Sequence, residues 1–156
     1  MTFRGLHEHN LDPKDRITVP SEYRTALAEG IVLMKGVEPC VEVWPAQAAE
    51  EMEAATLTQL NPLSRDARRL QRRTFAHSVS AKLDSNGRIL LPKMLLEHGG
   101  LEGRCVIAGM GRRLEIWNPE EWLAEDEENE KQTPALTESL AAQQAAAQGM
   151  LPGGRG

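Results

Sequence analysis

The sequence predicts an α+β protein in which two copies of a small β unit share one core and carry helices outside it. The first observation is an internal repeat, because the pattern Leu-Asp-x-x-x-Arg-Ile-x-x-Pro at residues 11–20 recurs at residues 83–92. A second match joins the Glu-x-Trp of residues 42–44 to that of residues 115–117. Units of ~70 residues are marginal alone and rich in strand edges. We therefore expect the two copies to interleave their hairpins into one pseudo-two-fold β unit.

Each copy begins with a hairpin, and the second copy carries the stronger signal. Asn86-Gly87 marks a tight turn, because both residues tolerate a positive φ. Residues 89–91 are large and apolar, as in a buried strand, and Pro92 ends the run because it has no N–H for a sheet ladder. The first copy has Asp15 where the second has Gly87, so its turn lacks the usual glycine and gains a negative charge.

The remaining elements follow in the same order in both copies. In the first copy we expect strand–turn–strand, a short helix and two strands, at residues 3–20, 21–28, 31–34 and 41–44. The second copy repeats the helix and the later strands at residues 93–98, 105–107 and 114–117, with Gly99-Gly100 as the helix stop.

Two helices are expected between the copies. The first covers residues 46–60, and the second begins at Asn61-Pro62, which combines a good N-cap with a good first helical residue. On the second helix, one face carries Leu63, Ala67, Leu70 and Thr74. The opposite face carries Arg65, Arg68, Arg69, Arg72 and Arg73. This cationic face is either a solvated surface or a surface that supports DNA contact or meets an acidic neighbour.

The C-terminal part of the chain has a different composition. Asn118-Pro119 starts a helix that we expect to end near residue 130. Beyond it, Ala, Gln, Glu and Gly dominate, and no apolar stripe is wide enough to dock a helix firmly. Residues 124–156 are therefore expected to be an acidic, disordered tail, or a helix ordered only by packing.

The charge distribution leaves room for a nucleic-acid partner. The net charge of the chain is −5, but residues 120–156 hold eight acidic and two basic residues, a net −6. The rest of the chain is therefore at +1, and a local basic patch remains possible there. The domain boundaries that we expect are 1–60 for the first repeat, 61–80 for a linking basic helix, 81–123 for the second repeat and 124–156 for the tail.

Few features point to catalysis or metal binding. His7-Glu8-His9 lacks the i, i+4 spacing of a zinc helix, and no phosphate-binding glycine loop or nucleophile–base pair is apparent. Cys40 and Cys105 lack a Cys-x-x-Cys spacing and are expected to be reduced thiols. No run approaches the ~18 apolar residues of a membrane span. We therefore expect neither an enzyme, a cofactor, a metal, a small-molecule substrate nor a membrane partner.

The two copies of Leu-Asp-x-x-x-Arg-Ile-x-x-Pro resemble the AbrB/SpoVT swapped-hairpin family of DNA-binding proteins, over roughly residues 1–123. The resemblance implies tandem AbrB-like swapped-hairpin β units that form a pseudo-two-fold barrel with flanking helices. It further implies a sequence-specific transcriptional regulator that binds double-stranded DNA at direct repeats as a ring-shaped homo-oligomer. Such a regulator would be cytoplasmic and nucleoid-associated, and would act on the promoter of a division and cell-wall gene cluster.

The candidate site lies in the two loops. We expect DNA contacts from Lys14, Arg16, Asn86 and Arg88, because Arg can engage phosphate or guanine with two hydrogen bonds. Asp12, Asp84 and Gly87 are expected to hold the loop geometry. A single loop of this kind could be a structural salt bridge only, but two related loops favour DNA.

A protein-interaction role is the alternative function. Relatives of this fold serve as antitoxins with a disordered toxin-binding tail, and the acidic tail here fits that role loosely. Antitoxins of this type carry one copy of the unit, so the duplication counts against this alternative.

Overall fold

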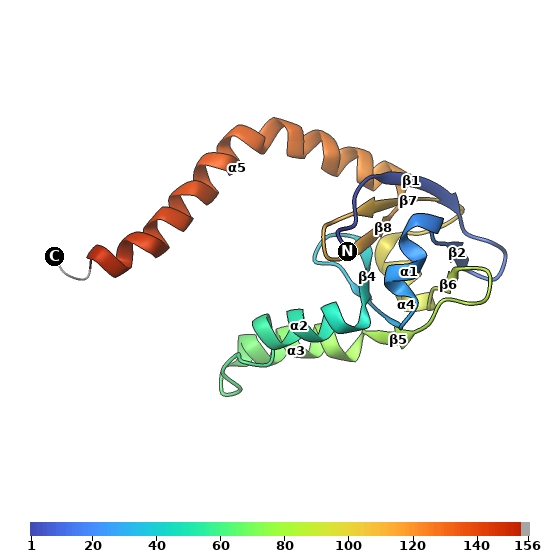
Figure 1. Ribbon diagram of the computed structural model, residues 1–156, viewed down its shortest axis with the longest axis horizontal. Helices are drawn as coiled ribbons and strands as arrows, with labels where there is room; N and C mark the ends of the chain where they lie inside the picture. The colour runs from blue at the N-terminus through green and yellow to red at the C-terminus, as the bar shows by residue number, and fades with distance from the viewer. Residues whose placement is uncertain (154–156) are drawn as a thin grey trace. The chain divides into compact units, whose positions relative to one another are not determined.

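The structure is a computed structural model that describes residues 1–153, with side chains described for residues 1–149 (Figure 1). The strands are β1 (Leu6–Asn10), β2 (Arg16–Thr18), β3 (Ile31–Lys35), β4 (Cys40–Pro45), β5 (Val79–Ala81), β6 (Arg88–Leu90), β7 (Arg104–Gly109) and β8 (Leu114–Trp117). The helices are the 3₁₀ turn η1 (Ser21–Tyr23), α1 (Arg24–Leu27), α2 (Ala46–Thr56), α3 (Arg65–Ala76), α4 (Lys93–Gly99) and α5 (Pro119–Gly153). Residues 1–119 form one compact unit, and the segment from Glu120 onward forms a second.

The strands of the two copies are interleaved in the sheet, and their order is related by a pseudo-two-fold axis. The six-stranded antiparallel sheet has the order β1-β7-β8-β4-β3-β5, and β2 pairs with β6 in a second sheet. Because β1, β3 and β4 correspond to β5, β7 and β8 in the repeat, the order reads the same from either end. Four of the pairings, β1–β7, β4–β8, β3–β5 and β2–β6, join one copy to the other. The predicted interleaving of the copies is thereby confirmed.

The α+β class is also confirmed, but the expected barrel is not closed. Within residues 1–153, β1 and β5 are the two edges of the large sheet and do not pair with one another. The strands β2 and β6 pair only with each other, over three residues each. Pro20 and Pro92 come two residues after these strands, and the pairing does not continue past them because proline cannot donate to a ladder.

The core lies between the large sheet, the β2–β6 pair and the short helices. It is mainly aliphatic, as the low aromatic content requires, and Ile17 and Ile89 are both essentially inaccessible in it. Phe3 and Tyr23 are the aromatic members, with ring centroids 5.3 Å apart in an edge-to-face arrangement. This core places the β2–β6 pair firmly on the rest of the unit.

Two glutamates face each other where the central strands of the copies meet. Glu42 on β4 lies directly opposite Glu115 on β8. The indole Nε1 of Trp44 donates to Glu42 Oε1 at 2.9 Å, and that of Trp117 donates to Glu115 Oε1 at 3.0 Å. Arg113 lies between the carboxylates, with Nη2 2.9 Å from Glu115 Oε2 and Nε 3.7 Å from Glu42 Oε2. One guanidinium therefore serves two carboxylates on the pseudo-two-fold axis.

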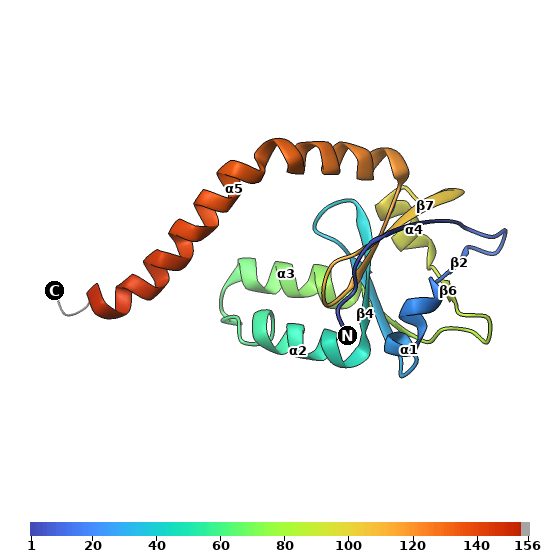
Figure 2. The same cartoon turned by 45° about the horizontal axis from the view of Figure 1, so that its top comes forward.

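The helices between the copies differ in detail from the sequence-based expectation. α2 and α3 lie side by side as an antiparallel pair (Figures 1 and 2). α3 begins at Arg65 with Ser64 as its N-cap, because Ser64 Oγ accepts from the Ala67 amide at 3.3 Å. The predicted start at Asn61-Pro62 was wrong, since Asn61 instead closes a turn by accepting from the amide of Leu63 at 3.0 Å. The side chain of Leu63 is 85% exposed and is not part of the packed face, whereas Ala67 is.

The C-terminal helix is longer than the sequence suggested. α5 continues from Pro119 to Gly153 without a break, whereas we expected its end near residue 130. Its residues beyond that point are rich in Ala and Gln, which favour helix without creating an apolar stripe. Residues 154–156 of the expected tail lie outside the described part of the chain. Among the described helices, none is both long and apolar enough to cross a membrane.

Candidate nucleic-acid interface

The two hairpin loops lie together at one side of the first unit. We call residues 11–15 and 83–87 the tips, and the β2–β6 pair the ribbon; Figures 1 and 2 show both tips on the same side of the fold. The ribbon pairs Arg16 with Leu90, Ile17 with Ile89 and Thr18 with Arg88. Two further backbone bonds cross between the copies, from the Leu91 amide to Asp15 O at 3.0 Å and from the Val19 amide to Gly87 O at 2.9 Å. Tips and ribbon therefore form one continuous piece.

Each tip is built around an aspartate. Asp12 Oδ1 accepts from the amides of Lys14 and Arg16 at 2.8 and 2.9 Å, and Asp12 Oδ2 accepts from Arg16 Nε at 2.7 Å. Asp84 makes the same three bonds in the second copy, at 2.8, 2.9 and 2.8 Å. A carboxylate thus closes the turn and fixes the arginine at the same time.

These contacts favour the ionised form of both carboxyls. The backbone amide of Arg16 lowers the pKa of Asp12, with further lowering by its guanidinium, and Arg88 lowers the pKa of Asp84 in the same way. Because the folded-state pKa lies below the ordinary value, the stabilisation is present at neutral pH. It is lost as the pH falls through the lowered pKa.

The turn residues of the two tips have the same backbone conformation despite their different side chains. Gly87 has φ of 72°, and Asp15 adopts a φ of 62° at the matching position. Aspartate is among the few residues that tolerate this left-handed region. The Arg24 side chain covers Gly87 so closely that a Cβ added there would clash with it. Arg24 Nε also donates to Val19 O at 3.0 Å, so this side chain is fixed beside the second tip.

Arg24 is a basic residue of this surface that the sequence did not reveal. It belongs to α1, outside the repeated loop pattern, and the corresponding residue of the second copy is Leu96. A comparison of the two copies therefore does not identify Arg24 as a candidate site residue. The only available signal was the presence of one basic residue in an otherwise uncharged or acidic short helix, residues 21–28.

The two tip arginines are partly buried. Their side chains are 29% and 27% exposed for Arg16 and Arg88. In each, Nε holds the aspartate of its own loop, and Arg88 Nη1 also lies 3.9 Å from Asp12 Oδ2. A guanidinium carries five N–H donors, so the Nη groups can bind a second acceptor pair, such as a phosphate or the N7 and O6 of guanine. Fixing the side chain in advance lowers the entropy cost of such a contact.

Replacing Asp84 should affect DNA affinity through the loop. Asp84→Asn keeps an oxygen acceptor for the two backbone amides but loses the charge that holds Arg88. Asp84→Ala loses both. We expect the unmodified protein to bind DNA most tightly and Asp84→Ala most weakly. The affinity of Asp84→Asn should be closer to that of the unmodified protein. The measurement is titration of a labelled duplex. If both variants lost the same amount of affinity relative to the unmodified protein, Asp84 would act only through its charge.

The arginines of α3 have mixed roles. Arg68 Nη1 donates to Pro62 O and Arg73 Nη2 donates to Gly36 O, both at 2.8 Å, so these two arginines tie down loops. Arg69 lies 3.8 Å from Asp66 in an exposed pair. Arg65, Arg69 and Arg72 are exposed. The cationic face is thus narrower than the sequence suggested.

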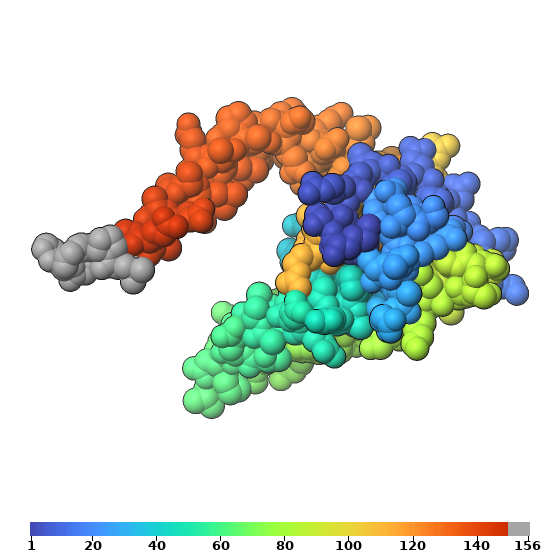
Figure 3. All heavy atoms as spheres, in the orientation of Figure 1, coloured from blue at the N-terminus to red at the C-terminus, as the bar shows by residue number. Residues whose placement is uncertain are grey.

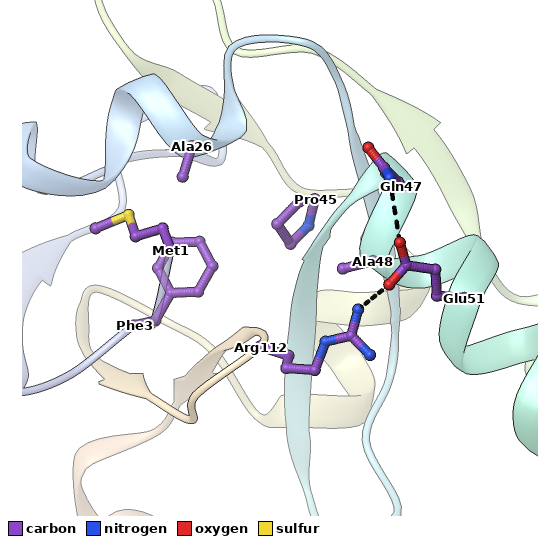
Figure 4. Close-up of a pocket in the computed structure, with 8 residues that line it drawn as sticks. All are labelled: Met1, Phe3, Ala26, Pro45, Gln47, Ala48, Glu51 and Arg112. Atoms are coloured by element: carbon purple, nitrogen blue, oxygen red, sulfur yellow. Dashed lines mark hydrogen bonds and ion pairs between the residues drawn. The ribbon is translucent and has the colours of Figure 1, made fainter.

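One pocket lies away from the tips, near the N-terminus. A pocket of about 310 Å³ lies between the N-terminus, α1 and α2, and Figure 4 shows its lining. Its polar side chains bond to each other: Gln47 Nε2 donates to Glu51 Oε1 at 3.2 Å, and Arg112 pairs with Glu51. The lining otherwise consists of apolar side chains, so it holds no nucleophile with a base. In the described part of the chain, no group of three or more His, Cys, Asp or Glu is placed to hold a metal ion.

Comparison with known proteins agrees with the duplication. A family model described as "MraZ protein, putative antitoxin-like" matches twice, over residues 2–73 and 74–145. The transcriptional regulator MraZ of Roseiflexus castenholzii is 39% identical over 120 residues, which covers 77% of this chain and 83% of that protein. Proteins of the same name from Pediococcus pentosaceus and Thioalkalivibrio sulfidiphilus are 36% and 37% identical, and cover 88% and 89% of this chain and 96% and 99% of their own length.

These relatives place the chain among transcriptional regulators rather than enzymes. Two tandem matches over most of the chain identify the family without ambiguity. The chain belongs to the MraZ family.

Proposed function

We propose that the protein is a sequence-specific DNA-binding transcriptional regulator that contacts double-stranded DNA through the ribbon and its tips. The observation that carries this proposal is the pair of aspartate-anchored arginines on one face of a two-stranded ribbon. The major groove of B-DNA admits a two-stranded β-ribbon, and arginine is the commonest reader of guanine there. Selecting the fragments of genomic DNA that the protein binds tests the proposal and identifies the DNA sequence that it recognises.

The residues of the two tips have different roles in this proposal. Arg16 and Arg88 engage base edges or phosphates, and Asn86 contributes a polar side chain at the second tip. Lys14 supplies a point charge to phosphate. Asp12, Asp84 and Gly87 set the loop geometry and act indirectly. Asp15 carries a negative charge at the first tip, so we propose that the two tips contribute unequally.

The proposal includes assembly, because one chain offers a small contact surface. Specific DNA binding typically buries ~1,000–2,500 Å² of protein surface. Several chains that bind neighbouring direct repeats supply this area through a high effective concentration. We propose a ring-shaped homo-oligomer at the promoter of the division and cell-wall gene cluster, in the cytoplasm and associated with the nucleoid. Light scattering that gave the mass of a monomer at micromolar concentration would contradict the assembly.

Lys14→Ala should weaken binding to all DNA sequences alike. The side chain is proposed to contact phosphate, and each lost phosphate contact lowers the slope of log affinity against log salt by about one. The measurement is binding of a selected duplex and of an unrelated duplex over a range of salt concentrations. A loss confined to the selected duplex would instead assign Lys14 to base recognition. Lys93→Ala, an exposed lysine on α4, is the control and should leave the slope unchanged.

A second candidate function is an antitoxin-like interaction through the C-terminal segment. The family description and the acidic residues 120–130 favour it. The test is a chain that ends after Leu123. If it binds DNA as the full chain does, the acidic segment is free to serve another partner; if it binds more tightly at low salt only, the segment competes with DNA electrostatically.

A further inference from the structure

The ribbon has an outward-facing side, and the proposed function gives no role to some of the residues on it. Along each strand, side chains alternate between the core and the outside, so Ile17 and Ile89 point inward. Their neighbours point to the opposite face, which we call the outer face: Arg16, Thr18, Arg88 and Leu90. Leu90 is 62% exposed there, directly across the ribbon from Arg16. A large apolar side chain is thus displayed beside an arginine that is proposed to contact DNA.

The pseudo-two-fold axis makes Thr18 and Leu90 equivalent positions. The pairing of Arg16 with Leu90 is repeated on the other side of the axis by that of Arg88 with Thr18. The arginines and their aspartates have nearly identical geometry in the two copies. The backbone therefore presents itself to DNA in two nearly equal orientations. Besides the difference between Asp15 and Gly87 at the tips, the outer face differs between the two orientations, since one arginine has leucine beside it and the other has threonine.

We infer that Leu90 is a specificity-determining residue, which packs against a thymine methyl group next to the base pair contacted by Arg16. Thr18 offers a hydroxyl at the equivalent place beside Arg88. The inference rests on the proposed DNA-binding role of the ribbon. Its consequence is that each chain recognises a non-palindromic element, and binds it in one orientation rather than two. This polarity adds to the difference between the tips, and helps a protein with a pseudo-two-fold backbone to bind its element in one direction.

The chemistry of the major groove supports this assignment. Thymine presents a C5 methyl group there, and apolar side chains contact it, whereas a hydroxyl can pair with donors or acceptors of several bases. Burying the exposed Leu90 side chain against a methyl group removes apolar area from water, which is favourable. In the alternative, the side chains of Thr18 and Leu90 both face solvent in the complex. It predicts no base preference at either position.

The test uses uracil, which is thymine without the methyl group. The full-length protein is titrated with a selected duplex and with a series of duplexes in which each thymine in turn is replaced by uracil. For the unmodified protein we expect one uracil position to weaken binding by about fivefold, the low end of the cost of one altered base pair. In Leu90→Ser, binding of the thymine duplex should be weaker by a similar factor, and that uracil position should have no further effect.

Leu6→Ser provides a matched control, because Leu6 is 55% exposed on β1, at the end of that strand remote from the tip. It should keep the uracil effect. A uracil effect of the same size in Leu90→Ser as in the unmodified protein, or none at any position, would overturn the inference. Selection with Thr18→Leu tests polarity: the selected element should gain a second thymine at the two-fold-related position, and an unchanged element would contradict the inference.

The outcomes also distinguish this inference from the function on which it rests. If the Arg16→Ala, Arg88→Ala double variant loses specific binding while Leu90→Ser does not, only the role of Leu90 fails. If the double variant binds as the unmodified protein does, the ribbon itself is removed from the DNA site.

Discussion

The double variant Arg16→Ala, Arg88→Ala should lose most specific DNA binding. Each arginine that reads a base edge is worth ~1–3 kcal/mol of discrimination, so each single variant should weaken specific binding by that amount. The double variant should be weaker than either. The two losses need not add, since Arg88 Nη1 is 3.9 Å from Asp12 Oδ2, the partner of Arg16. The measurement is titration of a selected duplex and of an unrelated duplex at one salt concentration.

Two further variants sharpen this experiment. Arg65→Ala removes an exposed arginine at the start of α3 and matches the change in charge of each single variant. It should leave the ratio of specific to non-specific affinity unchanged. Arg16→Lys keeps the charge but loses the two-pronged geometry, and should retain non-specific binding while losing specificity. Binding curves of the double variant that overlay those of the unmodified protein would exclude the ribbon from the interface.

Arg113→Met should produce the largest loss of stability. The guanidinium lies between Glu42 and Glu115, whose side chains are only 13% and 5% exposed. Removing one partner of a buried ionic group leaves uncompensated charge, which typically costs ~3–5 kcal/mol. We expect the free energy of unfolding to fall by this amount at neutral pH. The measurement is urea denaturation followed by tryptophan fluorescence, at a fixed protein concentration.

The pH dependence of this loss has a definite sign. Burial raises the pKa of Glu42 above its ordinary value, although the Trp44 hydrogen bond and Arg113 oppose the rise. A raised carboxyl pKa destabilises the fold above the folded-state value, and this cost disappears as the pH falls below the ordinary pKa. Without Arg113 the pKa of Glu42 should rise further. The destabilisation of Arg113→Met should therefore be smaller at pH 5 than at pH 7.5.

The neighbouring residue gives the control. Arg112 pairs with Glu51, and their side chains are 57% and 51% exposed. Exposed ion pairs contribute ~0–1 kcal/mol, so Arg112→Met should have a small effect that hardly depends on pH between 5 and 7.5. Equal losses for the two arginine variants would mean that the buried cluster contributes no more than a surface pair.

The repeat explains why so much of the architecture could be predicted from the sequence. Matching Asp12 to Asp84 and Glu42 to Glu115 predicts two equivalent units, and their small size predicts that they share a core. Which strands meet is a tertiary property: nothing local in the sequence places the two glutamates opposite each other. The separation of β2 and β6 from the large sheet is likewise a tertiary property.

At the candidate interface, local and tertiary information divide in the same way. The aspartate-centred turns follow from residues within five positions of each other, and the structure has them as hydrogen-bonded tips. Arg24 reaches the second tip from a different element, so no local pattern reveals it. The start of α3 at Arg65 was missed because Ser64 and Asn61 are both good caps, and only packing decides between them.

The strand order has a consequence for synthesis of the chain on the ribosome. Until the second copy is made, the first copy holds only the β3–β4 hairpin as a completed pair, because β2 pairs with β6, β1 with β7 and β4 with β8. At ~5–20 residues per second, the stretch from residue 79 to residue 117 takes roughly 2–8 seconds to be made. During that interval two nascent chains on one message carry equivalent unpaired strands, each a suitable partner for the other. Pairing between the two copies of one chain therefore competes with pairing between neighbouring chains. The covalent link favours pairing within the chain, because it keeps the second copy at a high local concentration.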